Sequence, residues 1–288
     1  MLKIGFIGAG ITGTALAWTL YQKGFNIHAV TSRGLSSVET FASRIKNCEI
    51  CNSAQEIADN CDLIFITTPD DIISSIASSV MWRKQQYVVH CSGAHSLDIL
   101  EPAAKSGAIP GGFHPLQSFA DIEQAMRNLP GSTFAIEAEE PLLSLLKDMA
   151  VSLNGEWILL KSEDKPLYHA AAVFASNYLV TLVKIAADLW NNFGVPAERA
   201  CQGLLPLMRG TLENVQKIGL PNCLTGPVAR GDLGTIKKHI ETLKRANPEI
   251  FACYKLLGWH TIPIALAKGK ISLQQAAELK KILKEEEK

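Results

Sequence analysis

The sequence lacks an excess of charge of either sign. Its 288 residues include 28 Lys and Arg against 28 Asp and Glu, so the formal net charge is zero. Nucleic acids and anionic membrane surfaces are bound through clusters of positive charge. The composition gives no reason to expect either of them, and we expect a small molecule as the partner.

Long apolar runs and a leader segment are also missing. The helical stretch richest in apolar residues is broken by Lys184 and Asp188, so no run is long enough to span a bilayer. A strand-like run begins at the second residue, which leaves no room for the charged and apolar regions of a secretory leader. We therefore expect a cytoplasmic protein without a membrane partner.

Paired cysteines at metal-ligand spacing are scarce. The seven cysteines are odd in number and scattered, as free thiols in a reducing compartment are. Cys48 and Cys51 have the spacing of a metal or redox pair. No second pair and no His follows at ligand spacing, so we expect no metal site.

What the sequence does contain is a glycine pattern between a strand and a helix. An apolar run over residues 2–7 and a helical pattern flank the segment Gly8-Ala9-Gly10-Ile11-Thr12-Gly13, and a second apolar run covers residues 25–30. In a βαβ unit the first glycine makes a tight turn, the second lets a pyrophosphate approach, and the third lets the helix pack closely. Free amides at the helix N-terminus hold the phosphates. The pattern predicts a dinucleotide site; the alternative is a Rossmann domain with an empty cleft.

The end of the second apolar run indicates which dinucleotide binds. NAD-binding folds usually place an acid about 20 residues after the glycines, where it binds the ribose 2′-hydroxyl. Here Thr31, Ser32 and Arg33 occupy that place. A hydroxyl and a guanidinium can bind a 2′-phosphate that an acid would repel. We expect NADP(H) in preference to NAD(H), unless Arg33 is merely a solvated loop charge.

The remaining pattern predicts an α/β fold with two domains. Apolar runs near residues 63–67 and 87–91 are typical of buried parallel strands, and shorter strands are expected near 49–51, 132–136 and 156–160. The pattern then becomes helical over 165–193, 197–208, 233–246, 248–267 and 273–286. We predict an N-terminal Rossmann domain, with a doubly wound parallel sheet, over residues 1–162. An all-α C-terminal domain should follow over residues 163–288.

Strand ends and an unusual glycine-rich segment supply site candidates in the first domain. Open α/β sheets bind ligands beyond the carboxyl ends of their strands, so Thr68, Pro69 and Ser92 should face the cofactor. Ser92 would lie toward the nicotinamide, or else be a cap or turn serine. His114 follows several glycines that are unfavourable to order unless backbone passes close to something. It is a site candidate, the alternative being a satisfied buried histidine.

Polar residues in the helical half supply further candidates. His169 and Ser176 are seven residues apart on one expected helix face, with Asn177 adjacent. A His and an amide facing a nicotinamide would suit proton donation and polarisation of a carbonyl or imine, although a lone helical His is more often packed. Arg230 could bind a substrate carboxylate or pair with Asp232, the expected N-cap of the next helix.

Several segments resemble known families. The amino half is similar to the Rossmann domains of the 6-phosphogluconate dehydrogenase-like superfamily, which includes β-hydroxyacid dehydrogenases, pyrroline-5-carboxylate reductase and F420-dependent NADP reductases. Four further segments resemble bacterial Rossmann-like proteins with a DUF2520 C-terminal domain: HCSGA (90–94), GFHPLQSF (112–119), YHAAA to ASNY (168–178) and LTGP to RGD (224–232). The resemblance implies an NADP-type fold and a helical domain that is often dimeric. We expect a homodimer formed through that domain.

One departure separates the chain from the β-hydroxyacid dehydrogenases, which carry a catalytic Lys one helical turn before an Asn. Val173 stands four residues before Asn177, and Lys165 and His169 are the only nearby substitutes. The sequence favours an NADP(H)-dependent oxidoreductase that transfers hydride between nicotinamide and a small carbonyl or imine. His114 or His169 would handle the proton, while Ser92, Asn177 and Arg230 would position the substrate. The alternative is a non-catalytic NADP(H)-binding protein whose helical half serves dimerisation or regulation.

Overall fold

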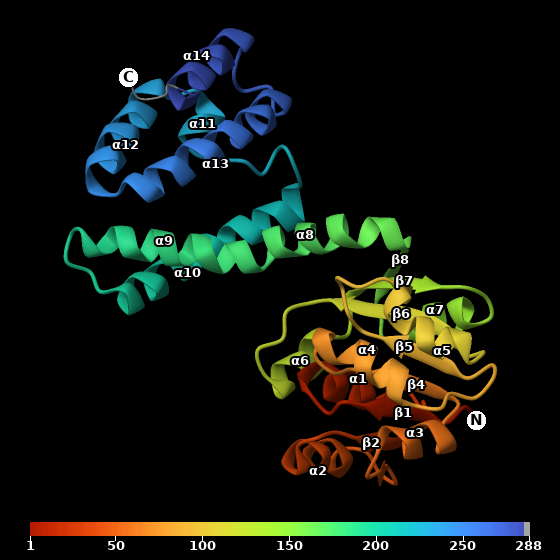
Figure 1. Cartoon of the computed structure of the whole chain (residues 1–288). Coiled ribbons are helices and arrows are strands. Elements are labelled where there is room, and N and C mark those ends of the chain that lie inside the picture. Colours follow the sequence, from red (N-terminus) through yellow and green to blue (C-terminus); the bar gives the residue numbers. More distant parts are fainter. Residues whose placement is uncertain (285–288) are drawn as a thin grey trace. The chain divides into compact units, whose positions relative to one another are not determined.

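The computed structural model describes residues 1–284 (Figure 1). Contacts within the chain define a first unit over Met1–Tyr178 and a second unit that begins at Leu179. The first unit contains the whole sheet, its flanking helices and the first helix that follows the last strand. The expected domain boundary between residues 162 and 163 stays a prediction.

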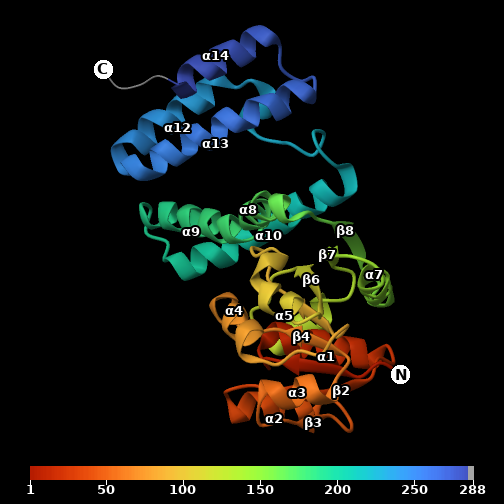
Figure 2. The same ribbon diagram turned by 45° about the vertical axis from the view of Figure 1, so that its right-hand side comes forward.

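An eight-stranded sheet forms the centre of the first unit, in the order β3-β2-β1-β4-β5-β6-β7-β8 (Figures 1 and 2). The strands are β1 (Ile4–Ile7), β2 (Ile27–Thr31), β3 (Glu49–Ile50), β4 (Leu63–Ile66), β5 (Tyr87–His90), β6 (Ile109–Leu116), β7 (Thr133–Ala138) and β8 (Glu156–Leu159). All neighbours are parallel except β6 and β7. The strand order reverses between β1 and β4, which is where ligands bind in doubly wound sheets. The predicted Rossmann fold is confirmed.

Two apolar layers cover the sheet, because successive side chains of a strand point to opposite faces. On one face a row of aromatic rings comes from β1, β4, β6 and β7: Phe6 stacks on Phe65 at 5.2 Å between ring centroids, and Phe113 stacks on Phe134 at 4.6 Å. On the other face Ile7 and its neighbours form a separate core. The covering helices are α1 (Ile11–Gln22), α2 (Leu35–Ser43), α3 (Ala54–Asn60), α4 (Asp70–Ser79), α5 (Glu101–Lys105), α6 (Ile122–Asn128) and α7 (Leu142–Ser152).

Strand β6 is an element that the sequence pattern did not predict, because its glycines are unfavourable in a strand. It is an eight-residue strand that pairs with β5 on one side and β7 on the other. A Cβ on Gly111 would lie 2.8 Å from a methyl carbon of Leu142, so this glycine allows α7 to pack closely on the strand. Close packing of a helix, and not loop conformation, explains the glycine there.

The chain beyond β8 is helical, as predicted (Figure 1). A short 3₁₀ turn over Ser162–Asp164 leads into α8 (Lys165–Ala175), and the further helices are α9 (Asn177–Asn191), α10 (Ala197–Ile218), α11 (Pro227–Arg230), α12 (Leu233–Ala246), α13 (Pro248–Ala267) and α14 (Leu273–Lys284). Helix α10 continues through Pro206 to Ile218, ten residues further than expected. Within the second unit, α12, α13 and α14 share a core that contains Ile236, Ile262 and Leu279. The predicted end of the last helix, at residue 286, lies outside the described residues.

Two helical stretches have the length and apolar composition of membrane spans, over residues 162–191 and 248–267. The first was expected to be interrupted by Lys184 and Asp188, yet it still meets this criterion. Length and composition are weak evidence, since helices of soluble proteins meet the same criterion. The absence of a membrane partner remains a prediction.

Candidate functional site

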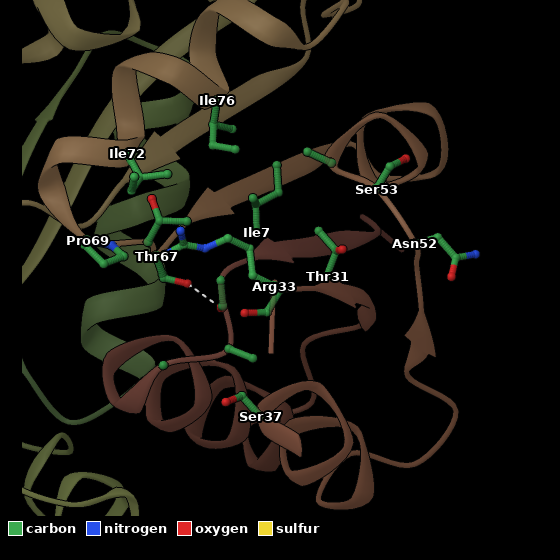
Figure 3. A pocket seen from close by; sticks show the side chains of 16 residues that line it. Ile7, Thr31, Arg33, Ser37, Asn52, Ser53, Thr67, Pro69, Ile72 and Ile76 are labelled. Atoms are coloured by element: carbon green, nitrogen blue, oxygen red, sulfur yellow. Dashed lines mark hydrogen bonds between the residues drawn. The ribbon is translucent and has the colours of Figure 1, made fainter. Parts of the chain in front are cut away.

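A cavity of about 370 Å³ lies at the carboxyl ends of β1, β2 and β4 (Figure 3). Seven residues predicted to bind the cofactor line it: Gly8, Ala9, Gly10, Ser32, Arg33, Thr68 and Pro69. Three others, Ile11, Thr12 and Gly13, form the start of α1 directly beside it. Ser92 does not line this cavity. The walls are completed by residues that the sequence did not single out for this purpose, among them Ser37, Asn52, Ser53, Thr67, Ile72 and Ile76.

The three glycines differ in what surrounds them. Gly8 has φ +115°, and a Cβ there would lie 2.7 Å from the Thr67 carbonyl carbon. A Cβ on Gly13 would meet Thr67 Oγ1 and the Gly8 carbonyl oxygen, so α1 approaches the sheet closely at this point. Gly10 is the N-cap of α1 without a side-chain cap, and no atom lies within 4 Å of its missing Cβ. The open position is therefore the one where a phosphate would approach backbone amides.

Two threonines after β4 line the cavity next to the glycine turn. Thr67 Oγ1 donates a hydrogen bond of 2.7 Å to the Gly8 carbonyl oxygen and ties the glycine turn to the neighbouring strand. Thr68 Oγ1 is buried and has no hydrogen-bond partner within residues 1–284. Buried hydroxyls in native proteins are rarely left unpaired, so the unsatisfied atom and the open helix terminus fit a polar ligand such as a dinucleotide.

The end of β2 supplies the polar groups farther along the cavity. Ser32 and Arg33 follow β2. Ser37 lies on α2, and Asn52 and Ser53 follow β3 (Figure 3). No Asp or Glu is among the described residues that line the cavity. The same rule about strand ends could have found Asn52, but β3 is only two residues long and gives little apolar signal.

A second cluster of polar side chains comes from the ends of β5 and β6 and from α4 and α8. His114 Nδ1 lies 2.8 Å from the Tyr168 hydroxyl oxygen, and the two rings meet edge to face. Ser92 Oγ donates to Asp70 Oδ2 at 2.7 Å and accepts from the backbone amides of Ala94 and His95. Ser92 therefore both stabilises a turn and binds a carboxylate. Asp70 lies in the first turn of α4, directly after the N-cap residue Pro69.

Burial sets the protonation of the His114–Tyr168 pair. Burial, followed by the charges of Lys165 and His169, lowers the pKa of His114 from 6.5 to about 4. Burial alone raises the pKa of Tyr168 from 10.0 to about 12. At neutral pH the imidazole is uncharged and the phenol keeps its proton. The proton that such a pair can supply therefore resides on Tyr168 and not on an imidazolium.

A buried ion pair lies near His114 and Tyr168, and no sequence pattern indicated that its two residues are partners. Lys165 Nζ is 3.5 Å from Glu137 Oε2, with 1% and 7% of the two side chains exposed. Burial lowers the pKa of Lys165, while Glu137 acts in the opposite direction. The sequence offered Lys165 only as a substitute for an absent lysine. Nothing in the pattern linked it to a glutamate near the end of a strand 28 residues earlier.

The other predicted catalytic residues differ in their exposure and in their place in the fold. His169 follows Tyr168 on α8 and is exposed, and Asn177 begins α9. His169 and Ser176 do not lie on one continuous helix as expected, because α8 ends at Ala175 and Ser176 has φ −117°. Arg230 belongs to the second unit, with its guanidinium 3.9 Å from Asp232 Oδ2. The roles of these residues in catalysis remain predictions.

Asp232 behaves as the sequence predicted. Its side chain accepts a hydrogen bond from the backbone amide of Thr235 at 3.0 Å and so caps α12. The cap hydrogen bonds lower the pKa of this carboxyl group.

Two family models match the chain. Residues 1–115 match a Rossmann-like domain, and residues 132–261 match DUF2520, a domain of unknown function. The chain combines a Rossmann-like domain with a DUF2520 domain. No curated protein matches it.

Solved structures share the fold over nearly the whole chain. A candidate NADP oxidoreductase from Bacteroides fragilis is 27% identical, with a TM-score of 0.70, over 91% of this chain and 98% of that one. A protein from Thermotoga maritima is 24% identical, with a TM-score of 0.73, over 92% and 99%. A pyrroline-5-carboxylate reductase from Coxiella burnetii is 17% identical, with a TM-score of 0.59, over 96% and 98%. The chain therefore shares the fold of these solved structures, with a Rossmann-like domain followed by a helical region.

Proposed function

We propose that this DUF2520 protein is an NADP(H)-dependent oxidoreductase that transfers hydride between the nicotinamide and a small carbonyl or imine compound. The observation that carries the proposal is the cavity around Gly8 and Gly10, with its open helix terminus and the unpaired hydroxyl of Thr68. A reductive aminase from Aspergillus terreus in complex with NADPH shares the fold, with a TM-score of 0.61 at 13% identity. That likeness is in keeping with imine or carbonyl chemistry.

Each part of the site would have a separate task. Backbone amides at the start of α1 would hold the pyrophosphate, and Ser32 with Arg33 would bind the 2′-phosphate. The bound cofactor supplies or accepts the hydride. Tyr168 would deliver the proton to the substrate oxygen or nitrogen, with His114 orienting its hydroxyl. Ser92, held by Asp70, would help to position the substrate, and His169, Asn177 and Arg230 stay candidates for the same task.

The cofactor preference has a direct test. Arg33→Ala should weaken NADPH binding about 10- to 100-fold, because a hydrogen bond to a charged group contributes roughly 1.5–3 kcal/mol. Binding of NADH, which lacks the 2′-phosphate, should change little. Lys46→Ala removes an exposed cation that does not line the cavity and is the matched control. Equal losses for NADPH and NADH in Arg33→Ala would remove the 2′-phosphate role.

Catalysis is tested by following NADPH oxidation with a panel of keto acids, aldehydes and imines. Tyr168→Phe removes the proton and keeps the ring, and should lower kcat by about 10²–10⁴, the usual contribution of general acid catalysis. His114→Gln should also lower kcat, and Lys161→Met, which alters a lysine with 80% of its side chain exposed, serves as the control. Unchanged turnover in Tyr168→Phe and His114→Gln would exclude this pair as the proton source.

Val173 favours a second candidate function, because related dehydrogenases carry their catalytic Lys at this place on the helix. The alternative protein binds NADP(H) without turnover, and its helical half serves dimerisation or regulation. Tight NADPH binding together with no oxidation on the whole panel would support it. Turnover that depends on Tyr168 would exclude it.

We also propose a cytoplasmic homodimer formed through the helical half. Large apolar side chains are exposed on helices of the second unit, including Val180 (70%), Leu207 (68%) and Ile218 (55%). Exposed apolar side chains that gather on helices are typical of subunit interfaces. Light scattering should give twice the chain mass, and Leu207→Glu should shift the protein toward the monomer.

A further inference from the structure

Three buried polar atoms meet beside Gly112 in the first unit. Lys165 Nζ, Glu137 Oε2 and His90 Nε2 are all buried and have no hydrogen-bond partner within residues 1–284. An ideal Cβ on Gly112 would lie 3.2 Å from Lys165 Nζ and 3.5 Å from His90 Nε2. A glycine here leaves space for the ammonium group between β5, β6 and β7. The chain therefore accommodates a buried lysine at a place where an apolar residue would have been easier to bury.

Glu137 connects this lysine to the segment that leads into α8. One carboxylate oxygen lies 3.5 Å from Lys165 Nζ, and the other accepts a 2.6 Å hydrogen bond from Ser162 Oγ. Ser162 begins the 3₁₀ turn before α8, and Lys165 is the first residue of α8. A single side chain on β7 thus holds two points at the start of this helix.

Tyr168 lies one helical turn after Lys165, and its hydroxyl oxygen is 2.8 Å from His114 Nδ1. Residues three apart on a helix lie on the same side, so the depth at which Lys165 is held sets the position of Tyr168. We propose that Lys165 is a positioning residue, whose buried contact with Glu137 fixes the first turn of α8 so that the Tyr168 hydroxyl meets His114. Its effect on turnover rests on the proposed function; its effect on the His114–Tyr168 contact does not.

The charged and titratable groups near His114 come from several elements. Lys165, His169 and Tyr168 lie on α8, Asp70 lies on α4, and His90 lies on β5. Lys165 and His169 favour the uncharged imidazole, whereas Asp70 opposes them. Removal of the Lys165 charge should therefore raise the proton affinity of His114 in addition to releasing Tyr168.

The test that needs no enzyme activity is histidine-selective ¹⁵N NMR on the full-length protein. At neutral pH the ring signals of His114, assigned with His114→Gln, report which nitrogen carries the proton. Tyr168→Phe should change this tautomer pattern. Lys165→Met should produce the same change and raise the proton affinity of His114 about tenfold, or one pKa unit. Lys161→Met, which alters a lysine with 80% of its side chain exposed in the same segment, should leave His114 unchanged.

Gly112→Ala keeps every charge and displaces only the Lys165 ammonium, so it should move the His114 signals partway toward those of Tyr168→Phe. If Lys165→Met does not fold, Lys165→Met with Glu137→Gln removes both charges and takes its place. Wild-type His114 signals in the folded lysine variant, together with altered signals in Tyr168→Phe, would overturn the proposal.

Kinetics add a second readout when the protein turns over a substrate. Lys165→Met should lower kcat more than it alters KM, and should lower it no further in the Tyr168→Phe background, because both changes act through one hydroxyl. Multiplicative losses would show that Lys165 acts independently of Tyr168 and would contradict the proposal. A protein with no turnover would contradict the proposed function alone, since the NMR result still decides the role of Lys165.

Discussion

Acid should destabilise the protein through His90. This residue ends β5 and is fully buried, and its Nδ1 accepts a 3.1 Å hydrogen bond from the Ser92 backbone amide. Burial, followed by the charge of Lys165, lowers the pKa of His90 from 6.5 to about 3. The folded protein therefore holds this imidazole uncharged under conditions in which the unfolded chain takes up a proton. The stability that this provides is present above pH 6.5 and is lost as the pH falls toward 3.

The size of the effect follows from proton linkage. Between pH 6.5 and pH 4 the unfolded state binds about one more proton at this residue, and each pH unit then changes the free energy of unfolding by about 1.36 kcal/mol. Over about 2.5 units the loss is roughly 3 kcal/mol. Since domains are stable by roughly 5–15 kcal/mol, one histidine can remove a substantial part of the total.

Urea denaturation of the wild type and of His90→Gln at pH 7, 6, 5 and 4 measures this contribution. The glutamine amide does not titrate, and its carbonyl oxygen can still accept a hydrogen bond. The free energy of unfolding of His90→Gln should fall less steeply as the pH is lowered. Between pH 6 and pH 4 the slopes for the two proteins should differ by about one proton, or about 1.36 kcal/mol per pH unit. His114 titrates in both proteins, so its contribution cancels in the difference. Parallel curves for the two proteins would refute the assignment of a buried, uncharged His90.

Four further outcomes are expected. Gly13→Ala places a methyl against Thr67 Oγ1 and should reduce both thermal stability and NADPH affinity. Gly210→Ala, with open space around it on α10, should instead stabilise by up to about 1 kcal/mol. Thr67→Val loses the hydrogen bond to the Gly8 carbonyl and should destabilise by about 1 kcal/mol in chemical denaturation. Lys165→Met leaves Glu137 buried without a counter-charge and should destabilise by about 3–5 kcal/mol. Addition of Glu137→Gln should restore part of that loss.

The N-terminal βαβ unit was predictable because residues close together in the sequence specify it. Gly8, Gly10 and Gly13 have the turn, the open approach and the close packing that their spacing predicts. The parallel strands were recognisable as continuous apolar runs, since both faces of the sheet are covered. The boundaries of α12 and α13 also agree with the prediction, because Asp232 and Asn247 are caps readable from the sequence.

Strand β6 was missed because contacts with other elements, and not its own residue types, account for its glycines. Glycines in a strand have low intrinsic propensity, and the reason for Gly111 and Gly112 is visible only once α7 and Lys165 are in place. A single helix was expected over residues 165–193, but the backbone conformation changes at Ser176, and α9 ends at Asn191. No Gly or Pro marks that break.

The lysine of α8 differs in position and burial from the catalytic lysine that the resemblance to the β-hydroxyacid dehydrogenases would lead one to expect. In the dehydrogenases that the chain resembles, a lysine one turn before Asn is the catalytic acid or base, and Val173 cannot replace it. The only lysine in α8 is Lys165, which is 1% exposed and paired with Glu137. The Lys165 ammonium is buried beside Glu137, whereas the half-buried Tyr168 one turn later keeps its proton at neutral pH. For the proposed reductase activity, this geometry favours Tyr168 as the proton donor and Lys165 as the residue that positions it.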